Sequence, residues 1–253
     1  LKNGSILCGG VGTGKSRTAL AYYYQRECHG EAPVNGEGDW EPMTDPRDLY
    51  IITTAKKRDS LEWEIECGQF LLCDDPEESI NVVSYIVDSW NNIKKYTNVT
   101  GAFFIFDEQH VVGWGAWSKA FLKITNRNHW ILLSATPGDK WTDYISVFIA
   151  NRFYRNKTEF NARHCVFSRF AKYPKIERFV DVGTLMKHRE DVLVRMEYVR
   201  STIPHYEDVV CDYDRFVYLR VARDRWNVYD NEPIVETGKL GYLMRRVVNS
   251  DYS

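Results

Sequence analysis

The chain has 253 residues, 44% of them hydrophobic and 27% charged, and a formal net charge of −2. Because no run of about 18 apolar residues occurs, we expect no transmembrane span and no membrane partner, and the start of the sequence has no secretory signal. The net charge does not by itself indicate nucleic-acid binding. The first residue is Leu rather than Met, so we expect a fragment of a longer chain.

Six cysteines are scattered along the sequence: Cys8, Cys28, Cys67, Cys73, Cys165 and Cys211. None forms a CxxC pair, and the neighbouring Cys and His residues at 28–29 and 164–165 do not have the spacing of a zinc site. We therefore expect free thiols and a cytoplasmic location, where such thiols stay reduced.

The sequence opens with a predicted strand, a glycine-rich turn and a helix. The apolar residues Ile6–Cys8 predict a buried strand, and Lys15–Arg26 has a helical pattern. Between them, residues Gly9–Ser16 match GxxxxGKS, the phosphate-binding loop. A glycine-rich turn that matches by chance is disfavoured, because the strand and the helix supply the context that the motif requires.

This loop predicts an ATP site. Glycines let successive backbone N–H groups converge on phosphate oxygens, and the start of the following helix favours anions. Lys15 is expected to reach the β- and γ-phosphates, and the Ser16 hydroxyl to ligate Mg²⁺. The predicted nucleotide contacts are Gly9, Gly10, Val11, Gly12, Thr13, Gly14, Lys15, Ser16 and Arg17.

The next part of the chain is expected to alternate between strands and helices. Residues His29–Pro46 are rich in Gly, Pro and acidic residues and are typical of an irregular insertion. Strands are predicted at Leu49–Thr53 and Ile80–Ser84, and helices at Asp59–Phe70 and near Asp88–Tyr96.

Two acidic residues follow the next predicted strand. Ala102–Phe106 is wholly apolar, as expected for the buried centre of a parallel sheet. Directly after it, Asp107 is predicted to hold Mg²⁺, and Glu108 to act as general base toward the attacking water. Gln109 and His110 are expected to sense the nucleotide state. Acids can also end strands because they cap the next helix, but together with the phosphate-binding loop this pair indicates an ATPase.

The third candidate motif is SAT at residues 134–136. It follows a predicted helix at 114–124 and a predicted buried strand at 130–133. Two hydroxyls there can bond to the acidic motif, whereas a plain turn before the next proline is the alternative. Its position after the two other motifs favours a role for Ser134 and Thr136 in coupling hydrolysis to movement.

Beyond about residue 150 the alternation weakens. Residues Arg152–Arg178 contain eight Lys or Arg and two acidic residues, which is typical either of a phosphate-facing surface or of a solvated helical face. Tyr206–Tyr218 is predicted as a strand and Thr237–Val248 as a helix. The whole pattern predicts an α/β fold with a doubly wound, mainly parallel sheet that binds its ligand at the carboxyl ends of the strands.

These motifs resemble, in this order, those of superfamily 2 helicases and translocases of the DExH type. GGVGTGKS is similar to motif I, FDEQH to motif II, SATP to motif III and NVVSY to motif Ib. ITTAKKRDSLEWEIECGQF is similar to motif Ia, with Trp63 and Glu66 where Swi/Snf-type motors carry a Trp and an acidic residue. Stretches such as FIFDEQHVVGWGAW and LMRRVVNSD resemble bacteriophage DNA helicases related to the Swi/Snf motors.

The resemblance implies a RecA-like P-loop NTPase domain at residues 1–200. It also implies that residues 201–253 connect to a second RecA-like domain of the same parent chain. Because that domain would supply an arginine finger, the chain alone is expected to bind nucleotide weakly and to hydrolyse it poorly. A phage origin would place the protein in the host cytoplasm.

The resemblance also implies contacts with the DNA backbone through motifs Ia and Ib. The DNA is expected to be duplex or branched rather than single-stranded. The residues concerned are Thr54, Lys56, Lys57, Arg58, Ser84 and Tyr85. A basic helix start exposed on the surface is the alternative for the three basic residues among them.

A DNA-dependent ATPase of the helicase or translocase class is the function that the sequence favours. A viral DNA-packaging ATPase is one alternative, although it would continue into a nuclease domain with clustered carboxylates. A nucleotide-dependent DNA-binding module without motor activity is the other alternative. The presence of Glu108 argues against an inactive site of that kind.

Overall fold

The computed structural model describes the chain except residues 34–38, 74–80, 109–113, 170–172, 198–211 and 250–253. The chain divides into two compact units, Leu1–Val199 and Arg200–Ser253. None of the helices in the described residues is long and apolar enough to cross a membrane.

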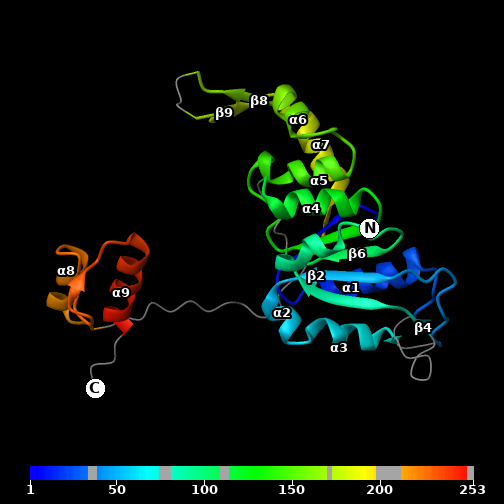
Figure 1. Ribbon diagram of the computed structural model, residues 1–253, viewed down its shortest axis with the longest axis horizontal. Coiled ribbons are helices and arrows are strands. Elements are labelled where there is room, and N and C mark those ends of the chain that lie inside the picture. Colours follow the sequence, from blue (N-terminus) through cyan, green and yellow to red (C-terminus); the bar gives the residue numbers. More distant parts are fainter. Residues whose placement is uncertain (34–38, 74–80, 109–113, 170–172, 198–211, 250–253) are drawn as a thin grey trace. The chain divides into compact units, whose positions relative to one another are not determined.

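Six strands form the central sheet of the larger unit (Figure 1). In sheet order they are β10 (Leu193–Arg195), β1 (Ile6–Cys8), β7 (His129–Ser134), β6 (Phe103–Phe106), β2 (Leu49–Thr53) and β5 (Tyr85–Ser89). Every neighbouring pair is parallel. All six carboxyl ends therefore meet at one edge, and the expected α/β fold with a parallel sheet is confirmed.

Helices cover both faces of this sheet. They are α1 (Lys15–Tyr22), α2 (Ala55–Asp59), α3 (Glu62–Gln69), α4 (Ala116–Thr125), α5 (Ile145–Ala150), α6 (Lys157–His164) and α7 (Val182–Val192). A π-helical turn at Tyr23–Glu27 extends α1, and 3₁₀ turns lie at Trp90–Tyr96 and Trp141–Tyr144. In the described residues of the larger unit, two short strand pairs lie outside the central sheet: β3 (Leu72–Cys73) with β4 (Asn81–Val82), and β8 (Cys165–Phe167) with β9 (Ile176–Phe179).

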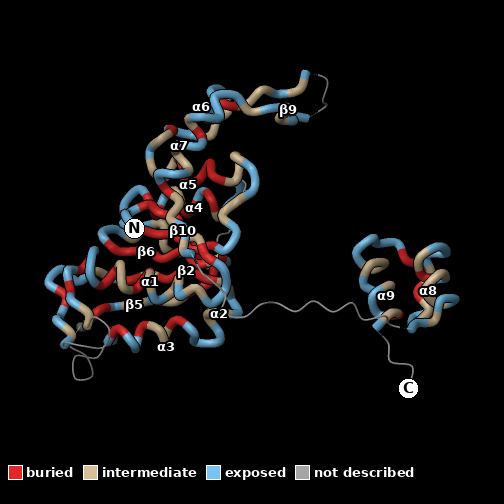
Figure 2. The backbone as a smooth tube through the Cα atoms, turned by 180° about the vertical axis from the view of Figure 1, so that it is seen from behind, coloured by how far each residue is buried: buried red, intermediate tan, exposed pale blue. Residues whose placement is uncertain are grey.

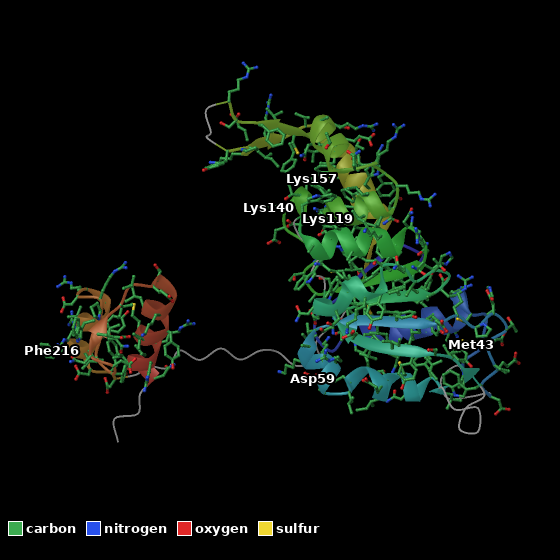
Figure 3. The ribbon with its side chains drawn as sticks, in the orientation of Figure 1. Met43, Asp59, Lys119, Lys140, Lys157 and Phe216 are labelled. Carbon is green, nitrogen blue, oxygen red and sulfur yellow. The ribbon has the colours of Figure 1, made fainter. Side chains whose placement is uncertain are left out.

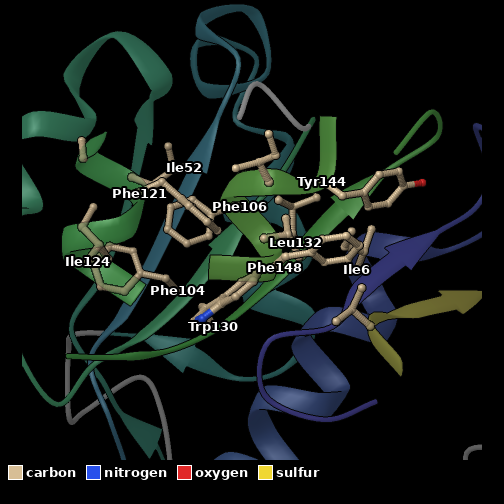
Figure 4. Packing of buried hydrophobic residues seen from close by; sticks show 14 of the residues in the cluster. Ile6, Ile52, Phe104, Phe106, Phe121, Ile124, Trp130, Leu132, Tyr144 and Phe148 are labelled. Atoms are coloured by element: carbon tan, nitrogen blue, oxygen red, sulfur yellow. The ribbon is translucent and has the colours of Figure 1, made fainter. Parts of the chain in front are cut away.

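The core has two layers because the residues of each strand point alternately to opposite faces. In β6, Phe104 and Phe106 pack in the layer of α4 and α5, and Phe103 and Ile105 pack in the layer of α1 and α3. The Phe106 ring meets the Phe121 ring edge-on, at 4.9 Å between centroids (Figure 4). Burying each such side chain contributes about 1.5–3 kcal/mol, and the buried positions follow the strands in Figure 2.

The smaller unit is built from two helices and a short antiparallel strand pair. Its elements are α8 (Arg215–Ala222), β11 (Trp226–Asn227), β12 (Glu232–Pro233) and α9 (Thr237–Asn249). Val221 of α8 packs with Leu243 and Val247 of α9, whereas Phe216 is 87% exposed (Figure 3). The predicted helix Thr237–Val248 is confirmed.

The strand predicted for Tyr206–Tyr218 is wrong where the structure describes it. Residues 206–211 lie outside the described residues, and Arg215–Tyr218 belong to α8. The physical reason is a helix cap: Asp214 Oδ1 accepts hydrogen bonds from the backbone N–H groups of Phe216 and Val217, which favours a helix start over an extended chain.

Two predictions in the larger unit also need correction. The central strand expected at Ile80–Ser84 is β5, which begins at Tyr85, because residues 81–82 pair with β3 instead. Polar residues at the end of β5 hide the strand from a hydropathy pattern. The helix expected at Asp59–Phe70 is α3, which begins later, at Glu62; the residues before it form the separate short helix α2, since Leu61 takes a φ of +56° between the two helices.

Candidate active site

Three of the predicted motifs follow neighbouring strand ends. β7 lies between β1 and β6, with Cys8 paired to Ser134 and Leu132 paired to Phe106. The Gly9 N–H donates a hydrogen bond to the Ser134 carbonyl at 3.2 Å. The loop after β1, the turn after β7 and the acidic residues after β6 are therefore at the same edge of the sheet.

The loop at Gly9–Ser16 is closed around its own lysine. Gly12 and Gly14 have φ values of +79° and +80°, where a Cβ would be strained. Lys15 Nζ donates to the carbonyl oxygens of Gly9 and Gly10, both at 2.7 Å. The Ser16 hydroxyl has no hydrogen-bond partner among the described residues, so it is free to take a ligand.

Two predicted nucleotide contacts are directed away from the loop. Val11 is 94% exposed. Arg17 pairs with Glu66 of α3 at 3.3 Å and also donates to Gln69. The structure thus uses Arg17 to tie the start of α1 to α3.

Asp107 is a buried carboxylate with several donors. Its side chain is 2% exposed, and Oδ2 accepts hydrogen bonds from Thr53 Oγ1 at 2.9 Å, Lys57 Nζ at 3.0 Å and Trp63 Nε1 at 3.1 Å. Trp90 Nε1 donates to the Asp107 carbonyl at 2.8 Å. A buried charge needs such partners, and Lys57 also supplies the opposite charge.

The Lys57 ammonium contacts both acids of the predicted pair. Besides Asp107 it reaches Glu108 Oε1 at 3.2 Å, and the Glu108 side chain is 44% exposed. Burial lowers the pKa of Lys57, but the charge of Asp107 and the hydrogen bonds to both carboxylates outweigh it, so the pKa of Lys57 is raised. Lys57 is therefore a stable cation between Asp107 and Glu108. These two residues are called the acidic pair below.

The residues of this edge fit Mg²⁺. Ser16 and Lys57 line one cavity of about 220 Å³ together with residues of α3. All described hydrogen bonds to the Asp107 carboxylate go to Oδ2, which leaves Oδ1 without a partner among the described residues. A hydroxyl oxygen and a carboxylate oxygen are the ligand types that Mg²⁺ prefers.

The structure describes only two of the four residues that were predicted to sense the nucleotide or to couple hydrolysis to movement. Ser134 Oγ accepts the N–H of Thr136 at 3.1 Å, which is the plain turn that the sequence left open as an alternative. Within the described residues, neither hydroxyl bonds to the acidic pair. Gln109 and His110 lie outside the described residues.

Four predicted DNA contacts follow β2 at the same edge of the sheet. Thr54 Oγ1 accepts the backbone N–H of Lys57 at 3.3 Å and so caps α2. Lys56 is exposed and has no ion pair in the described part of the chain. Arg58 pairs with Asp59 at 2.7 Å and with Asp88 at 3.4 Å; Figure 3 labels Asp59 at the end of α2.

The structure does not bring Ser84 and Tyr85 to this surface. Tyr85 is the first residue of β5 and pairs with Leu49, the first residue of β2. Both residues therefore lie at the amino edge of the sheet, opposite the acidic pair. The strand was expected too early in the sequence, and Asp88 and Ser89 occupy the carboxyl end of β5 instead.

Two residues on one face of α3 connect this helix to the site. The resemblance pointed to Trp63 and Glu66, and they contact Asp107 and Arg17 respectively. Thr53 and Trp90 were not foreseen. The only signal for Thr53 was its place at the end of a strand, next to the strand that ends before Asp107.

A larger cavity, of about 640 Å³, lies away from this site. Its lining includes Lys123, Arg127, Arg152 and Arg155, and none of the predicted site residues. These four cations have no ion pair among the described residues. The larger cavity volume therefore does not coincide with the predicted ATP site.

Of three comparisons with known proteins, the comparison with solved structures supports the fold. No family model matches the chain, and no curated protein matches it. Among the solved structures that match is the Sulfolobus solfataricus SWI2/SNF2 ATPase core in complex with dsDNA, with a TM-score of 0.54 and 14% identity over 76% of this chain and 40% of that one. The chain thus spans less than half the length of that protein. At this identity the likeness is one of fold, and the parallel sheet is that of a RecA-like domain.

Proposed function

We propose that the chain is the first motor domain of a DNA-dependent ATPase of the helicase or translocase class. The observation that carries the proposal is the convergence at one edge of the sheet. Ser16 of the phosphate-binding loop and Lys57 line the same cavity, and the Lys57 ammonium lies 3.0 Å from Asp107 and 3.2 Å from Glu108. An ATPase needs these two halves of a site together.

The reaction is the attack of water on the γ-phosphate of ATP, which breaks the bond from the γ-phosphorus to the bridging oxygen and releases ADP and inorganic phosphate. Lys15 neutralises charge on the phosphates, and the backbone N–H groups of the loop orient them. Glu108 orients the water and accepts its proton. Ser16 and Asp107 would hold Mg²⁺, which would supply positive charge against the negative charge of the phosphates.

DNA is the proposed partner of the surface at α2. One of the matching structures contains dsDNA, which supports a duplex over a single strand, and the Lys56 ammonium at the start of α2 has no ion pair among the described residues. Thr54, Lys57 and Arg58 lie beside it. The relation to bacteriophage helicases rests on the sequence stretches alone.

A second RecA-like domain belongs to the proposal. It would close on the ATP site and supply an arginine finger, which can raise the hydrolysis rate by orders of magnitude. The match over 40% of the SWI2/SNF2 core supports this arrangement. Gln109, His110, Ser134 and Thr136 are then proposed to pass the nucleotide state to that domain.

Nucleotide binding and hydrolysis by matched variants test the proposed function. We expect Lys15→Ala to weaken binding of ATP, and Glu108→Gln to bind ATP but hydrolyse it barely, because each removes one half of the site. Lys119→Ala and Glu190→Gln, which change exposed residues without described side-chain partners, are the controls. Hydrolysis is measured with duplex, branched and single-stranded DNA and with RNA, in this chain and in one that continues into a second domain.

Two results would contradict the proposal. Full turnover by Glu108→Gln would exclude the role of this carboxylate as general base. If the longer chain binds ATP and DNA but hydrolyses no ATP under any condition, the nucleotide-dependent binding module is the better interpretation.

A further inference from the structure

Lys57 has a position that a DNA contact alone does not explain. Its side chain is 28% exposed, and its ammonium is directed at the carboxylates rather than at solvent. The neighbouring Lys56 is exposed, and Arg58 is engaged by Asp59 and Asp88. Of the three consecutive basic residues, only Lys57 reaches the acidic pair.

The local structure fixes this direction. Thr54 caps α2, and its Oγ1 accepts the N–H of Lys57. The Lys57 carbonyl accepts a hydrogen bond from Ser60 Oγ at 3.0 Å. The backbone of Lys57 is thus held from both sides, and its side chain reaches the two carboxylates that follow β6.

A cation at this place competes with Mg²⁺. Lys57 and the metal are both positive, and both are attracted by Asp107 and Glu108. Because like charges a few ångströms apart repel strongly inside a protein, the ammonium and the metal cannot hold the same carboxylates at full strength. Lys57 on Oδ2 of Asp107 therefore weakens the binding of a metal at Oδ1 of the same carboxylate.

We propose that Lys57 is a built-in counter-cation of the acidic pair, which competes with Mg²⁺ and so raises the Mg²⁺ concentration that the ATP site requires. This inference rests on the proposed function and adds a regulatory contact to it. Lys57 is then a positioning residue: it keeps Asp107 and Glu108 together before the metal arrives and sets how much Mg²⁺ the site requires. Since it belongs to α2, it also connects the proposed DNA surface to the ATP site through one side chain.

The test removes the ammonium charge of Lys57 and keeps an unbranched apolar side chain of similar length. Binding of a fluorescent ATP analogue is titrated with Mg²⁺, and we expect Lys57→Met to lower the half-saturating Mg²⁺ concentration by about tenfold, because the competing cation is gone. Lys57→Gln, which can still donate a hydrogen bond, is expected to behave likewise and carries the test if the Met variant does not fold. Lys57→Arg restores the charge and is expected to restore the Mg²⁺ requirement. Lys94→Met, which removes an exposed lysine of the Trp90–Tyr96 turn, is the matched control.

A second readout needs no nucleotide. Mn²⁺ alone is titrated into the chain and followed by its electron paramagnetic resonance signal, and Lys57→Met is expected to bind it about tenfold more tightly than the unaltered chain. If the unaltered chain binds no nucleotide, the proposed function fails. The Mn²⁺ titration still decides the role of Lys57 in that case, because it needs no nucleotide. If the folded Met and Gln variants show unchanged or weaker metal binding, the inference is overturned even where nucleotide binding is intact.

Discussion

The contribution of the hydrogen bond between Trp63 and Asp107 to the free energy of unfolding can be measured separately from the packing of the Trp63 ring. Trp63 is 2% exposed and donates from Nε1 to the buried carboxylate at 3.1 Å. Trp63→Phe keeps an aromatic ring but removes the donor. A hydrogen bond to a charged group contributes about 1.5–3 kcal/mol, and the smaller ring adds a packing loss.

Trp130→Phe separates these two effects. Trp130 is 1% exposed, packs edge-on against Phe121, and has no described hydrogen bond from its indole nitrogen. Both variants lose similar ring volume, but only Trp63→Phe loses a bond to a carboxylate. The difference between them should therefore be about 2 kcal/mol, or about 4–8 °C in melting temperature for a protein of this size.

The assay is urea unfolding followed by far-ultraviolet circular dichroism, which does not depend on tryptophan fluorescence. Equal unfolding midpoints for the two variants, with unchanged slopes, would show that the loss of the Trp63 donor costs no stability. Asp107 would then draw no net stabilisation from Trp63, and α3 would not support the acidic pair in the way described.

Three further predictions concern other groups. Burial alone would raise the pKa of Asp88, but hydrogen bonds from Tyr96 and Asn92 bring that pKa below its ordinary value. The carboxylate therefore stabilises the fold above about pH 4 and loses this effect in acid. In thermal melts, Asp88→Asn should be less stable than the unaltered chain at pH 7, and the difference in melting temperature should shrink near pH 3. A difference that stays constant with pH would contradict this. Burial raises the pKa of the Cys67 thiol to about 12. Mass spectrometry should therefore find Cys67 unlabelled by iodoacetamide at pH 8 until urea unfolds the chain. Labelling of Cys67 in the folded chain would contradict this prediction. Lys56→Ala should weaken DNA binding and reduce the salt dependence of log K by about one, whereas an unchanged slope would remove Lys56 from the DNA surface.

Much of the sheet could be predicted from short apolar runs. β1, β2, β6 and β7 lie where the sequence places them, because each is bounded by turn residues or by polar residues that mark its end. β5 was misplaced because it ends in Asp88 and Ser89. Asp88 accepts hydrogen bonds from the Ser89 N–H at 2.7 Å and from the Tyr96 hydroxyl at 2.6 Å, so its polar atoms have partners nearby. A hydropathy pattern contains no information about such hydrogen bonds.

The chemistry of the site was easier to predict than its supports. A phosphate-binding loop and an acidic pair are local motifs, so Lys15 and Asp107 could be named from the sequence. The contacts of Asp107 with Thr53 and Trp63 are made between segments far apart in the chain, and they depend on the register of β2 and β6. The direction of Lys57 likewise depends on the short helix that Thr54 caps.

We infer that the phosphate-binding loop and the acidic pair bind one and the same nucleotide. A crystal structure of the chain with Mg²⁺ and a non-hydrolysable ATP analogue tests it most directly. We predict the triphosphate on the loop at Gly9–Ser16, with the metal held between the Ser16 hydroxyl and Asp107. A nucleotide bound in another cavity, or a metal that Asp107 does not approach, would contradict the account.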